Sequence, residues 1–346
     1  MSVVMPVYNG AAHVGEALDS VLGQTFTDFE VVAVDDGSTD DSWTVLATCA
    51  DRDRRVHIHR LPANRGHHVA SNTAIEMASG RYIARLDQDD LAEPERLART
   101  VEAFAADPSI GLVHSQYVRW LPDGRRSVRI PPATDGALRI TQQFRNTVCH
   151  SALTISADVL ARMGTWYRNL PGPQDYDLVL RSLQQARAHC IAAPLAVYRQ
   201  DTMAMTEQYA DRIQHAAEEI SGRELVRFLP AARIPAARRV FSLSATREDV
   251  GSVNDVRSVF AGVVAADPLI DADEATRFAR QWTGRAIRAA VARNGGLPRS
   301  ARVLGALVRG DPVGSAEWAR TEVAAAVRSV GVRRRTGAAQ RGIDTV

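Results

Sequence analysis

Three carboxylates stand within four positions of one another at the end of an apolar run. They are Asp87, Asp89 and Asp90, in the segment YIARLDQDDL at residues 82–91. Like charges this close repel one another, so solvent, basic neighbours or a bound cation must offset the repulsion. Carboxylates two positions apart at a strand end can converge on Mg²⁺ or Mn²⁺, and such a cation would neutralise a diphosphate leaving group. The alternative is a solvated acidic turn that caps the next helix.

A second acidic cluster follows another apolar run, in the segment VVAVDDGSTD at residues 31–40. Asp36 ends this run and precedes a tight turn, where a carboxylate can accept hydrogen bonds from a nucleobase imide or a ribose hydroxyl. The alternative is an ordinary loop between a strand and a helix, with Ser38 or Asp40 as the helix N-cap. We expect Asp40 to be only a cap.

Strand and helix patterns alternate through the first part of the chain, and these elements must position both clusters. Helical spacing of apolar residues separates the predicted strands, which lie at 2–7, 29–35, 56–61, 81–87 and 110–115. The alternation predicts βαβ units and therefore an α/β fold with a mainly parallel central sheet flanked by helices. Ligands bind beyond the carboxyl ends of the strands in such sheets, and both acidic clusters lie at those ends.

The pattern changes after about residue 115. A hairpin is predicted around residues 122–124, strands at 149–156 and 189–199, and a helix at 174–186. From about residue 207 onward only helical signals are found, rich in alanine and arginine. We therefore predict three regions, at residues 1–115, 116–206 and 207–346.

Composition excludes several classes of function. Hydrophobic residues make up 45% of the chain and charged residues 24%, and the net charge is only +2, so nucleic acid is not an expected partner. All 42 basic residues are arginine, which excludes a Schiff-base lysine and a P-loop lysine. The three cysteines show no CxxC spacing, which argues against a zinc site or a disulfide framework. We find no membrane-spanning run and no signal peptide, and we expect a cytoplasmic protein.

In order and spacing, three segments resemble the inverting GT-A glycosyltransferases of family 2. The segments are SVVMPVYNG, VVAVDDGSTD and NRGHHVASNTAIEMASGRYIARLDQDD, and the resemblance extends over about residues 1–205. It implies a GT-A fold in which residues 1–115 bind a nucleotide-sugar and residues 116–206 bind the acceptor, and the helical signals predict a helical C-terminal region at residues 207–346. It also implies which residues contact the donor and the metal. The nucleotide-sugar would contact Pro6, Val7, Tyr8, Asn9, Asp36, Asn64, Arg65, Gly66, Asp87 and Gln88, and the metal would bind Asp89 and Asp87.

The segment GPQDYDLVLRSL at residues 172–183 resembles the family's Glu-Asp-x-Asp-Leu-x-x-Arg motif. The resemblance makes Asp175 the base that deprotonates the acceptor hydroxyl, although this chain has Gln174 where a glutamate is usual. The alternative role for Asp175 is a first-turn carboxylate that favours the helix dipole.

The segment VYRQDTMAMT at residues 197–206 resembles the family's Tyr-Arg-x-His element. Asp201 occupies the histidine position, where it could bind Mg²⁺ but would repel a diphosphate. Arg199 could face the phosphates or form an ion pair at the sheet edge. The histidines show no ligand spacing and are expected in the core or on the surface; they are His67, His68, His114 and His150.

The sequence therefore favours an inverting, metal-dependent transferase that moves a sugar from a nucleoside-diphosphate sugar, with UDP-sugars preferred, to an acceptor hydroxyl. The Gln-x-x-Arg-Trp element of processive synthases is absent, so transfer of single sugars is expected. Two alternatives stay open: a degenerate protein that only binds nucleotide-sugars, and a sugar-1-phosphate nucleotidyltransferase. The second would need a Gly-rich loop after the first strand and usually a lysine, and the sequence has neither.

The C-terminal segment at residues 315–341 has the pattern of a basic amphipathic helix. Apolar residues share a stripe that includes Trp318 and Val327, and a run of arginines occupies 333–335. Such a helix can lie on an anionic membrane surface, which predicts peripheral contact with the inner face of the membrane. Alternatively, the stripe packs against the helical region and the arginines are solvated.

Overall fold

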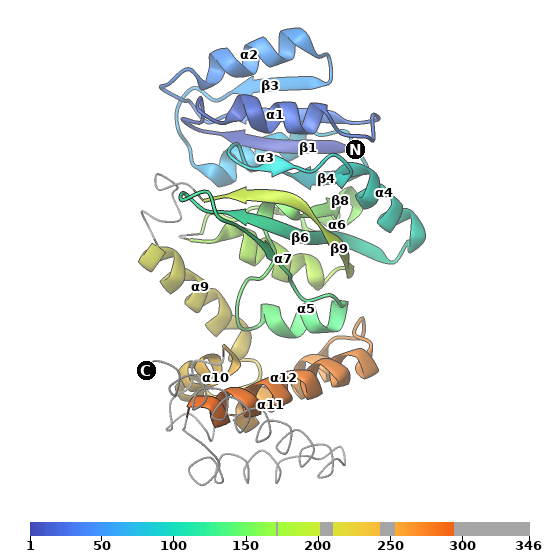
Figure 1. Ribbon diagram of the computed structural model, residues 1–346, viewed down its shortest axis with the longest axis vertical. Coiled ribbons are helices and arrows are strands. Elements are labelled where there is room, and N and C mark those ends of the chain that lie inside the picture. Colours follow the sequence, from blue (N-terminus) through green and yellow to red (C-terminus); the bar gives the residue numbers. More distant parts are fainter. Residues whose placement is uncertain (171, 201–209, 243–252, 294–346) are drawn as a thin grey trace, which may run out of the picture. The chain divides into compact units, whose positions relative to one another are not determined.

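A computed structural model describes residues 1–170, 172–200, 210–242 and 253–293 (Figure 1). Contacts within the chain divide it into two compact units, Met1–Ser221 and Gly222–Val346, and each unit is described by itself. The predicted division at residues 115 and 116 stays a prediction. Within the described ranges, every helix is too short or too polar to span a bilayer.

The first unit is built on one mixed sheet with the strand order β3-β2-β1-β4-β8-β6-β9-β5, and β7 pairs with β6 beside this path. The pairs β1–β2, β2–β3, β1–β4 and β6–β9 are parallel, whereas β4–β8, β6–β8, β6–β7 and β5–β9 are antiparallel. The strands are β1 Ser2–Val7, β2 Glu30–Asp35, β3 Val56–Arg60, β4 Tyr82–Arg85, β5 Leu91–Ala92, β6 Ile110–Trp120, β7 Arg126–Arg129, β8 Thr154–Ser156 and β9 Arg187–Arg199.

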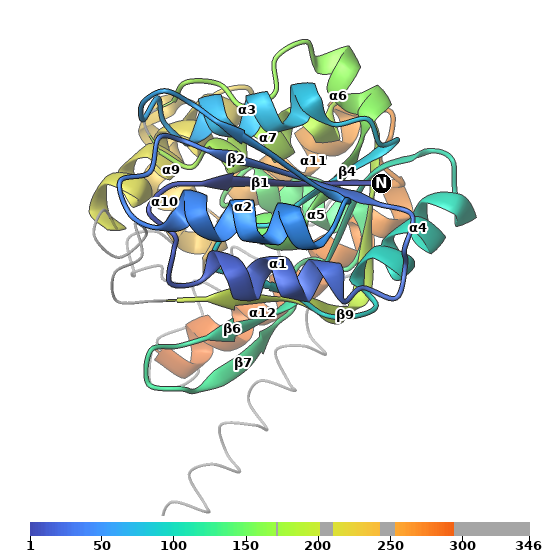
Figure 2. The same cartoon turned by 90° about the horizontal axis from the view of Figure 1, so that it is seen from above.

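Helices cover both faces of this sheet. They are α1 Val14–Leu22, α2 Ser42–Arg52, α3 His67–Met77, α4 Arg96–Ala106, α5 Asp135–Gln142, α6 Ala157–Met163, α7 Gln174–Leu183 and the first part of α9 Ala210–Leu225. In Figure 2, α1 and α2 lie on one side of β1 and α3 lies on the other.

Alternation along β1 explains the two layers of core. Met5 packs in the same buried cluster as Leu18 of α1 and Leu46 of α2. The next residue toward the amino end, Val4, points to the opposite face and packs in the cluster that contains Leu178 of α7. Because successive side chains of a strand point to opposite faces, one short apolar run supplies both cores.

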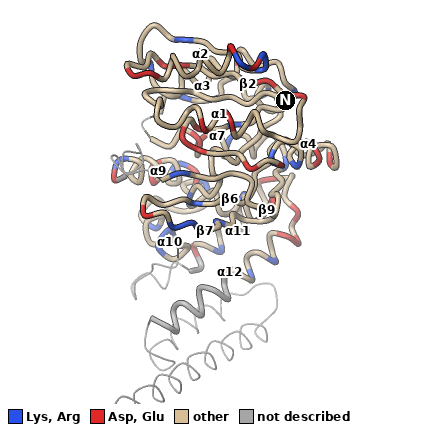
Figure 3. Tube along the Cα trace, turned by 45° about the horizontal axis from the view of Figure 1, so that its top comes forward, with Lys and Arg blue, Asp and Glu red and all other residues tan. Residues whose placement is uncertain are grey.

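The two halves of β6 differ in their burial and in their neighbouring strands. The first half, with Leu112 and Val113 buried, lies inside the sheet between β8 and β9. The second half continues as a hairpin with β7, in the register Tyr117↔Arg129 to Trp120↔Arg126. The hairpin projects from the body of the sheet (Figure 2) and carries arginines along β7 (Figure 3). The hairpin predicted around residues 122–124 is therefore confirmed.

The second unit contains the end of α9, the short 3-10 helix η2 Ala231–Arg233, and the helices α10 Ile234–Phe241, α11 Val253–Ala266 and α12 Ala272–Arg293. Its aromatic core is centred on Trp282, whose ring stacks on Phe241 at 5.8 Å and meets Phe260 edge-on at 5.3 Å. The indole N–H donates to the Phe241 carbonyl at 3.2 Å. The described part of this unit is helical, as predicted, and the C-terminal stripe at 315–341 lies outside the described residues.

Several elements differ from the expectations. Residues 149–156, predicted as one strand, form the 3-10 helix η1 His150–Ala152 followed by the three-residue strand β8. The short strand β5 and the helices α5 and α6 were not predicted. Helix α5 is unusual because every one of its residues is buried.

A buried ion pair holds α5 against the start of β9. Asp135 and Arg139 are each 2% exposed, and Arg139 Nε lies 2.8 Å from Asp135 Oδ2. The other oxygen of Asp135 accepts from Ala188 N at 2.8 Å, and Arg139 Nη2 donates to Ala186 O at 2.6 Å. This pair therefore ties α5 to the first residues of β9.

We expect Arg139→Met to destabilise the protein by about 3–5 kcal/mol, because it leaves the Asp135 charge buried without its partner. Urea unfolding followed by circular dichroism measures the change. The control is Arg99→Met, which removes an exposed ion pair on α4 and should cost less than about 1 kcal/mol. Equal midpoints for the two variants would contradict the account of α5.

Candidate active site

The loops after β1 and β2 are tied together by Asn9. This residue has φ 49°, a left-handed conformation that asparagine tolerates better than most residues. Asn9 N donates to Ser38 Oγ at 3.0 Å, and Asn9 Oδ1 accepts from Thr39 N at 2.9 Å. These hydrogen bonds join the loop after β1 to the loop after β2, and the two loops form one rim at the carboxyl ends of the strands.

Asp36 organises the loop that carries the Asn-Arg-Gly segment. The Asp36 side chain is 2% exposed, and its two oxygens accept from Arg65 N and Gly66 N, each at 2.8 Å. Gly37, with φ +69°, lies so close to this loop that an added Cβ would sit 2.6 Å from the Ala63 carbonyl carbon. Asp36, which follows β2, and residues 64–66, which precede α3, are therefore brought together. The side chains of Asn64 and Arg65 are exposed.

Pro6, Val7 and Tyr8 have different surroundings, although they are consecutive. Pro6 and Val7 are buried in β1, and the Val7 carbonyl accepts from Asp36 N at 2.7 Å. Tyr8 is 40% exposed at the strand end, so it is the one of the three whose side chain can meet a ligand. Gln88 binds the Tyr8 backbone twice, since Tyr8 N donates to Oε1 at 2.8 Å and Nε2 donates to the Tyr8 carbonyl at 3.1 Å.

Asp87 lies at the centre of the site, and both oxygens of its carboxylate have polar neighbours. Arg85 Nη2 donates to Asp87 Oδ1, and Ser151 Oγ donates to Asp87 Oδ2 at 3.3 Å. His150 Nδ1 lies 3.6 Å from the same Oδ2. Burial alone would raise the pKa of Asp87, but the charge of Arg85 holds that pKa well below its usual range. The side chain remains 27% exposed and can therefore still meet a ribose hydroxyl.

Arg85 is a cation enclosed by the protein. Its side chain is 3% exposed, and Nη1 donates to the carbonyls of Val4 and Leu86 at 3.1 and 2.5 Å. Nη2 lies 2.9 Å from His67 Nε2. A guanidinium has no acceptor, so Nε2 of His67 must accept and the proton must reside on Nδ1. Burial and the Arg85 charge lower the pKa of His67 to about 3, which keeps the ring neutral.

His150 and Tyr167 complete the wall behind Asp87. His150 Nε2 lies 2.5 Å from the Tyr167 hydroxyl, and the rings of His67, His150 and Tyr167 pack with centroids 5.6–5.8 Å apart. The expectation that His67 and His150 belong to the core or the surface is wrong, because both lie beside Asp87. His114 is a core residue as expected, being 1% exposed.

Asp89 differs from Asp87 in having no cationic partner. Across the described part of the chain its carboxylate forms no ion pair, and burial together with the charge of Asp87 raises the pKa of Asp89 to about 6. Asp90 does not cap a helix. It is buried, accepts from Arg199 N at 2.9 Å, and has a pKa raised well above the usual range by burial and by the two neighbouring carboxylates.

Asp175 reaches the same edge of the sheet from the first turn of α7. Its Oδ2 accepts from Asn146 Nδ2 at 2.8 Å, and burial raises the pKa of Asp175. The charges of His150 and Asp87 act on Asp175, which places the three groups in one electrostatic environment. Gln174 beside it donates from Nε2 to the Leu170 carbonyl at 3.1 Å.

Arg199 forms the sheet-edge ion pair that was one of its two expected roles. Its Nη2 lies 2.6 Å from Glu16 Oε2, and its Nε donates to the Asp89 carbonyl at 3.1 Å. The N-cap position of α2 is Asp41, not Asp40 as expected, and Asp40 is not only a cap, since it accepts both from Ser42 N at 3.0 Å and from Ala11 N at 3.1 Å. Asp201 lies outside the described residues.

The residues present fit one divalent cation at Asp89. Its carboxylate forms no ion pair within the described ranges and lies just after a strand end, and oxygen ligands of this kind suit Mg²⁺ or Mn²⁺. The ligand atoms of His67, Asp87 and His150 also lie within 4.8 Å of one another. There, however, the guanidinium of Arg85 already supplies the positive charge. Metal binding by Asp87 and by Asp201 stays a prediction.

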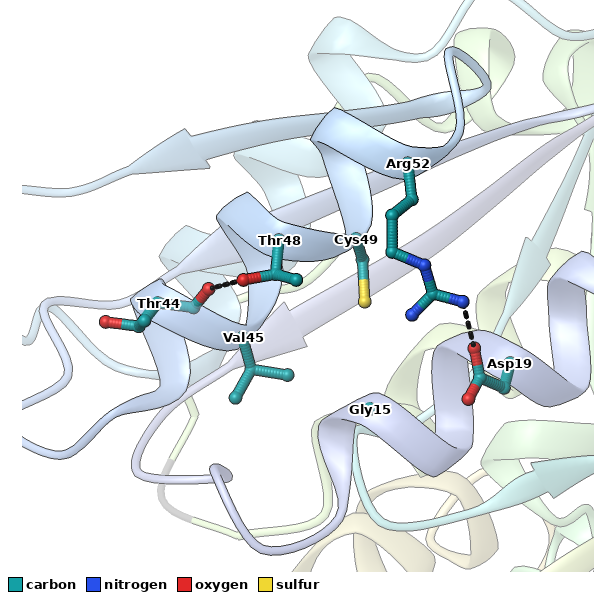
Figure 4. A pocket seen from close by; sticks show the side chains of 7 residues that line it. All are labelled: Gly15, Asp19, Thr44, Val45, Thr48, Cys49 and Arg52. Atoms are coloured by element: carbon teal, nitrogen blue, oxygen red, sulfur yellow. Dashed lines mark hydrogen bonds and ion pairs between the residues drawn. The ribbon is translucent and has the colours of Figure 1, made fainter.

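A hollow of about 210 Å³ lies away from these residues, in the groove between α1 and α2 (Figure 4). Arg52 and Asp19 form a 3.9 Å ion pair across it, and the sulfur of Cys49 points into it. Burial raises the pKa of the Cys49 thiol, so this thiol is a poor nucleophile at neutral pH. The hollow contains none of the predicted site residues.

Comparison with known proteins agrees with this architecture. Residues 2–159 match the model of the family Glycosyl transferase family 2. The uncharacterized protein y4gI of Sinorhizobium fredii (strain NBRC 101917 / NGR234) is 33% identical over 205 residues, which are 58% of this chain and 22% of that protein. The chain spans less than half the length of the first curated relatives it matches.

Two solved structures share the fold. S. aureus TarS 1-349 in complex with UDP-GlcNAc has a TM-score of 0.52 and 18% identity, covering 97% of this chain and 91% of that one. The mannosyltransferase PcManGT from Pyrobaculum calidifontis in complex with GDP-Man and Mn²⁺ has a TM-score of 0.54 and 19% identity, covering 89% and 86%. The sheet has the GT-A architecture of these structures, and residues 2–159 carry the similarity to glycosyltransferase family 2.

We expect Asp36→Asn to loosen the loop at residues 64–66. An amide has one acceptor oxygen instead of two, so one of the two backbone N–H groups loses its partner. Trypsin should then cut after Arg65 about tenfold faster or more, measured as release of fragment 1–65 by mass spectrometry. The control is Asp41→Asn, since Asp41 makes no side-chain capping bond. Equal cleavage rates for the two variants would show that Asp36 does not hold this loop.

Proposed function

We propose that this protein is an inverting glycosyltransferase that moves a single sugar from a nucleoside-diphosphate sugar to an acceptor hydroxyl. The observation that carries the proposal is the placement of Asp175 at the same sheet edge as Asp87 and Asp89, which come from an element far away in the sequence. A base and a diphosphate-binding group on either side of one reacting carbon are what a direct displacement requires.

Asp175 would act as the base. Burial raises the pKa of Asp175, which brings it closer to the range in which a carboxylate accepts a proton from a hydroxyl efficiently. The hydrogen bond from Asn146 Nδ2 binds the Oδ2 atom of Asp175 and fixes the direction of the carboxylate. Asn146 is therefore proposed as a positioning residue.

The rim formed by Asp36, Tyr8 and the 64–66 loop would bind the nucleotide. Asp36 already holds two backbone N–H groups, but a carboxylate has about four acceptor positions and can accept a further bond from a base or a ribose. The exposed ring of Tyr8 offers an apolar face beside it. UDP-sugars are the proposed donors, with TarS in complex with UDP-GlcNAc supporting a uridine and PcManGT in complex with GDP-Man showing that the fold also accepts guanosine.

Mg²⁺ or Mn²⁺ would be held by Asp89 and would supply positive charge for the departing diphosphate. Asp87 would bind ribose through its exposed surface while Arg85 keeps it ionised. Arg199, already bonded to the Asp89 carbonyl, holds the turn that presents Asp89 to the ligand.

We expect Asp89→Ala to abolish the Mn²⁺-dependent part of nucleotide binding, because it removes the carboxylate proposed to hold the metal. Calorimetric titration of UDP and GDP, each with Mn²⁺ and with a chelator, measures this. The control Asp41→Ala should bind as the unaltered protein does. If Asp89→Ala keeps its Mn²⁺ dependence, the metal is held elsewhere.

Asp175→Asn keeps the shape of the side chain but cannot accept the proton. Release of UDP from UDP-sugars should fall by about 10²-fold or more, while the affinity for UDP stays unchanged. Asp158→Asn, an exposed first-turn carboxylate of α6, is the matched control. Unchanged turnover would move the base elsewhere. An unaltered protein that binds UDP-sugars and never turns them over would favour the alternative of a binding protein without transfer activity.

A further inference from the structure

The hairpin of residues 117–130, called the β6–β7 arm, is a projecting element with an unusual surface. Its inner strand β6 also pairs with β9, from Tyr117↔Ala196 to Trp120↔Arg199, whereas its outer strand β7 pairs with β6 and forms an edge that extends from the body of the sheet (Figure 2). The turn at its tip closes through Leu121 N, which donates to the Arg125 carbonyl at 2.9 Å. Residues 122–130 are all exposed.

The β6–β7 arm is strongly basic. It contains four arginines, at positions 119, 125, 126 and 129, and a single acid, Asp123. Arg125 Nε lies 2.6 Å from Asp123 Oδ2, so this one pair is neutral. Arg126 and Arg129 have no acidic partner in the described residues, and they leave the outer strand with a positive charge.

The same strand exposes two large aliphatic side chains. Val128 is 51% exposed and Ile130 is 73% exposed, the highest value among the large hydrophobic residues in the described ranges. The two residues are two positions apart, so they lie on one face of the extended chain together with Arg126, and Arg129 between them lies on the other face of the same edge strand. Aliphatic side chains gathered on a projecting hairpin mark an interaction surface.

Contacts at the base of the arm make it rigid and connect it to the candidate active site. The Trp120 ring lies between two guanidinium groups, with Arg126 4.1 Å and Arg199 4.6 Å from its centroid. Arg199 in turn donates to Asp90 Oδ1 and to the Asp89 carbonyl. A surface that binds the arm would therefore lie next to the turn that carries the acidic cluster.

The arginines and the exposed aliphatic side chains of the β6–β7 arm together indicate which kind of partner it binds. Antiparallel pairing of β7 with a second copy of itself would bring arginines opposite arginines, which destabilises a strand pair. A soluble polyanion would use the arginines but leave Val128 and Ile130 in water. A bilayer that contains anionic lipid uses both, since the headgroups attract arginine and the interface takes up aliphatic side chains.

We propose that the β6–β7 arm docks this protein on an anionic lipid surface, through Arg126 and Arg129 to the headgroups and through Val128 and Ile130 to the interface below them. Docking does not depend on the transfer reaction. It does place the acidic edge of the sheet beside the membrane, where an acceptor attached to a lipid would be presented.

Sedimentation with vesicles tests the proposal on the full chain. Vesicles of phosphatidylcholine with 30 mol% phosphatidylglycerol, about the content that gives a strongly anionic surface, should bind the protein and release it as salt is raised. Val128→Ser/Ile130→Ser and Arg126→Gln/Arg129→Gln should each weaken binding about tenfold or more. The matched controls are Met77→Ser, a 42% exposed residue, and Arg52→Gln/Arg54→Gln on and after α2, and both should bind as the unaltered chain does.

Four results would overturn the proposal. The first is that the unaltered chain does not bind these vesicles. The second is that both arm variants bind within twofold of it, as they would if the residues at 294–346 made the whole contact. The third is that only the arginine variant weakens and inorganic polyphosphate competes equally, which would indicate a soluble polyanion. The fourth is concentration-dependent dimerisation that the serine variant abolishes. Thermal unfolding of each variant confirms that it is folded.

Discussion

The interaction on which the rest of this structure depends is the contact of Arg85 with Asp87. A charge held at the inner end of a parallel sheet is costly unless another charge meets it, and here the partner is two residues away on the same strand end. Arg85 also donates to the carbonyls of Val4 and Leu86, and it lies against His67 of α3. One guanidinium therefore joins β1, β4 and α3 to the acidic turn.

The contact of Arg85 with Asp87 gives the three carboxylates of the acidic cluster different environments. Asp87 is paired with Arg85, Asp90 is buried and accepts from the backbone of β9, and Asp89 forms no ion pair with any residue that the structure describes. Three carboxylates of identical chemistry thus acquire three roles from their surroundings. The repulsion evident in the sequence is resolved by an internal cation at Asp87, which leaves the charge of Asp89 for a metal or a ligand.

The positions of the strands and of the hairpin could be predicted from the sequence. The contacts between residues far apart in the sequence could not. Strands β1 to β4 and the hairpin were predictable because apolar runs and turn residues are local signals. The positions of His67 and His150 beside Asp87 could not be predicted, because they depend on how α3 and η1 pack on the sheet. Arg85 carried one detectable signal, a charged residue inside an otherwise buried strand, which calls for a partner.

Irregular elements were missed for a related reason. The strand β5 has two residues, and it exists because Leu91 and Ala92 pair with β9 from more than a hundred positions away. The Asn146 side chain, which fixes Asp175, lies in a loop whose sequence gives no pattern for this contact. The proposal that Asp175 is the base came from the family resemblance, and the structure adds a buried carboxylate held by Asn146.

The most direct test of the central claim is a crystal structure of the protein with UDP and Mn²⁺, with the metal located by its anomalous scattering. The division of roles predicts a manganese peak at the Asp89 carboxylate, with Arg85 still bonded to Asp87. A peak enclosed by His67, Asp87 and His150, with the guanidinium of Arg85 displaced, would contradict it.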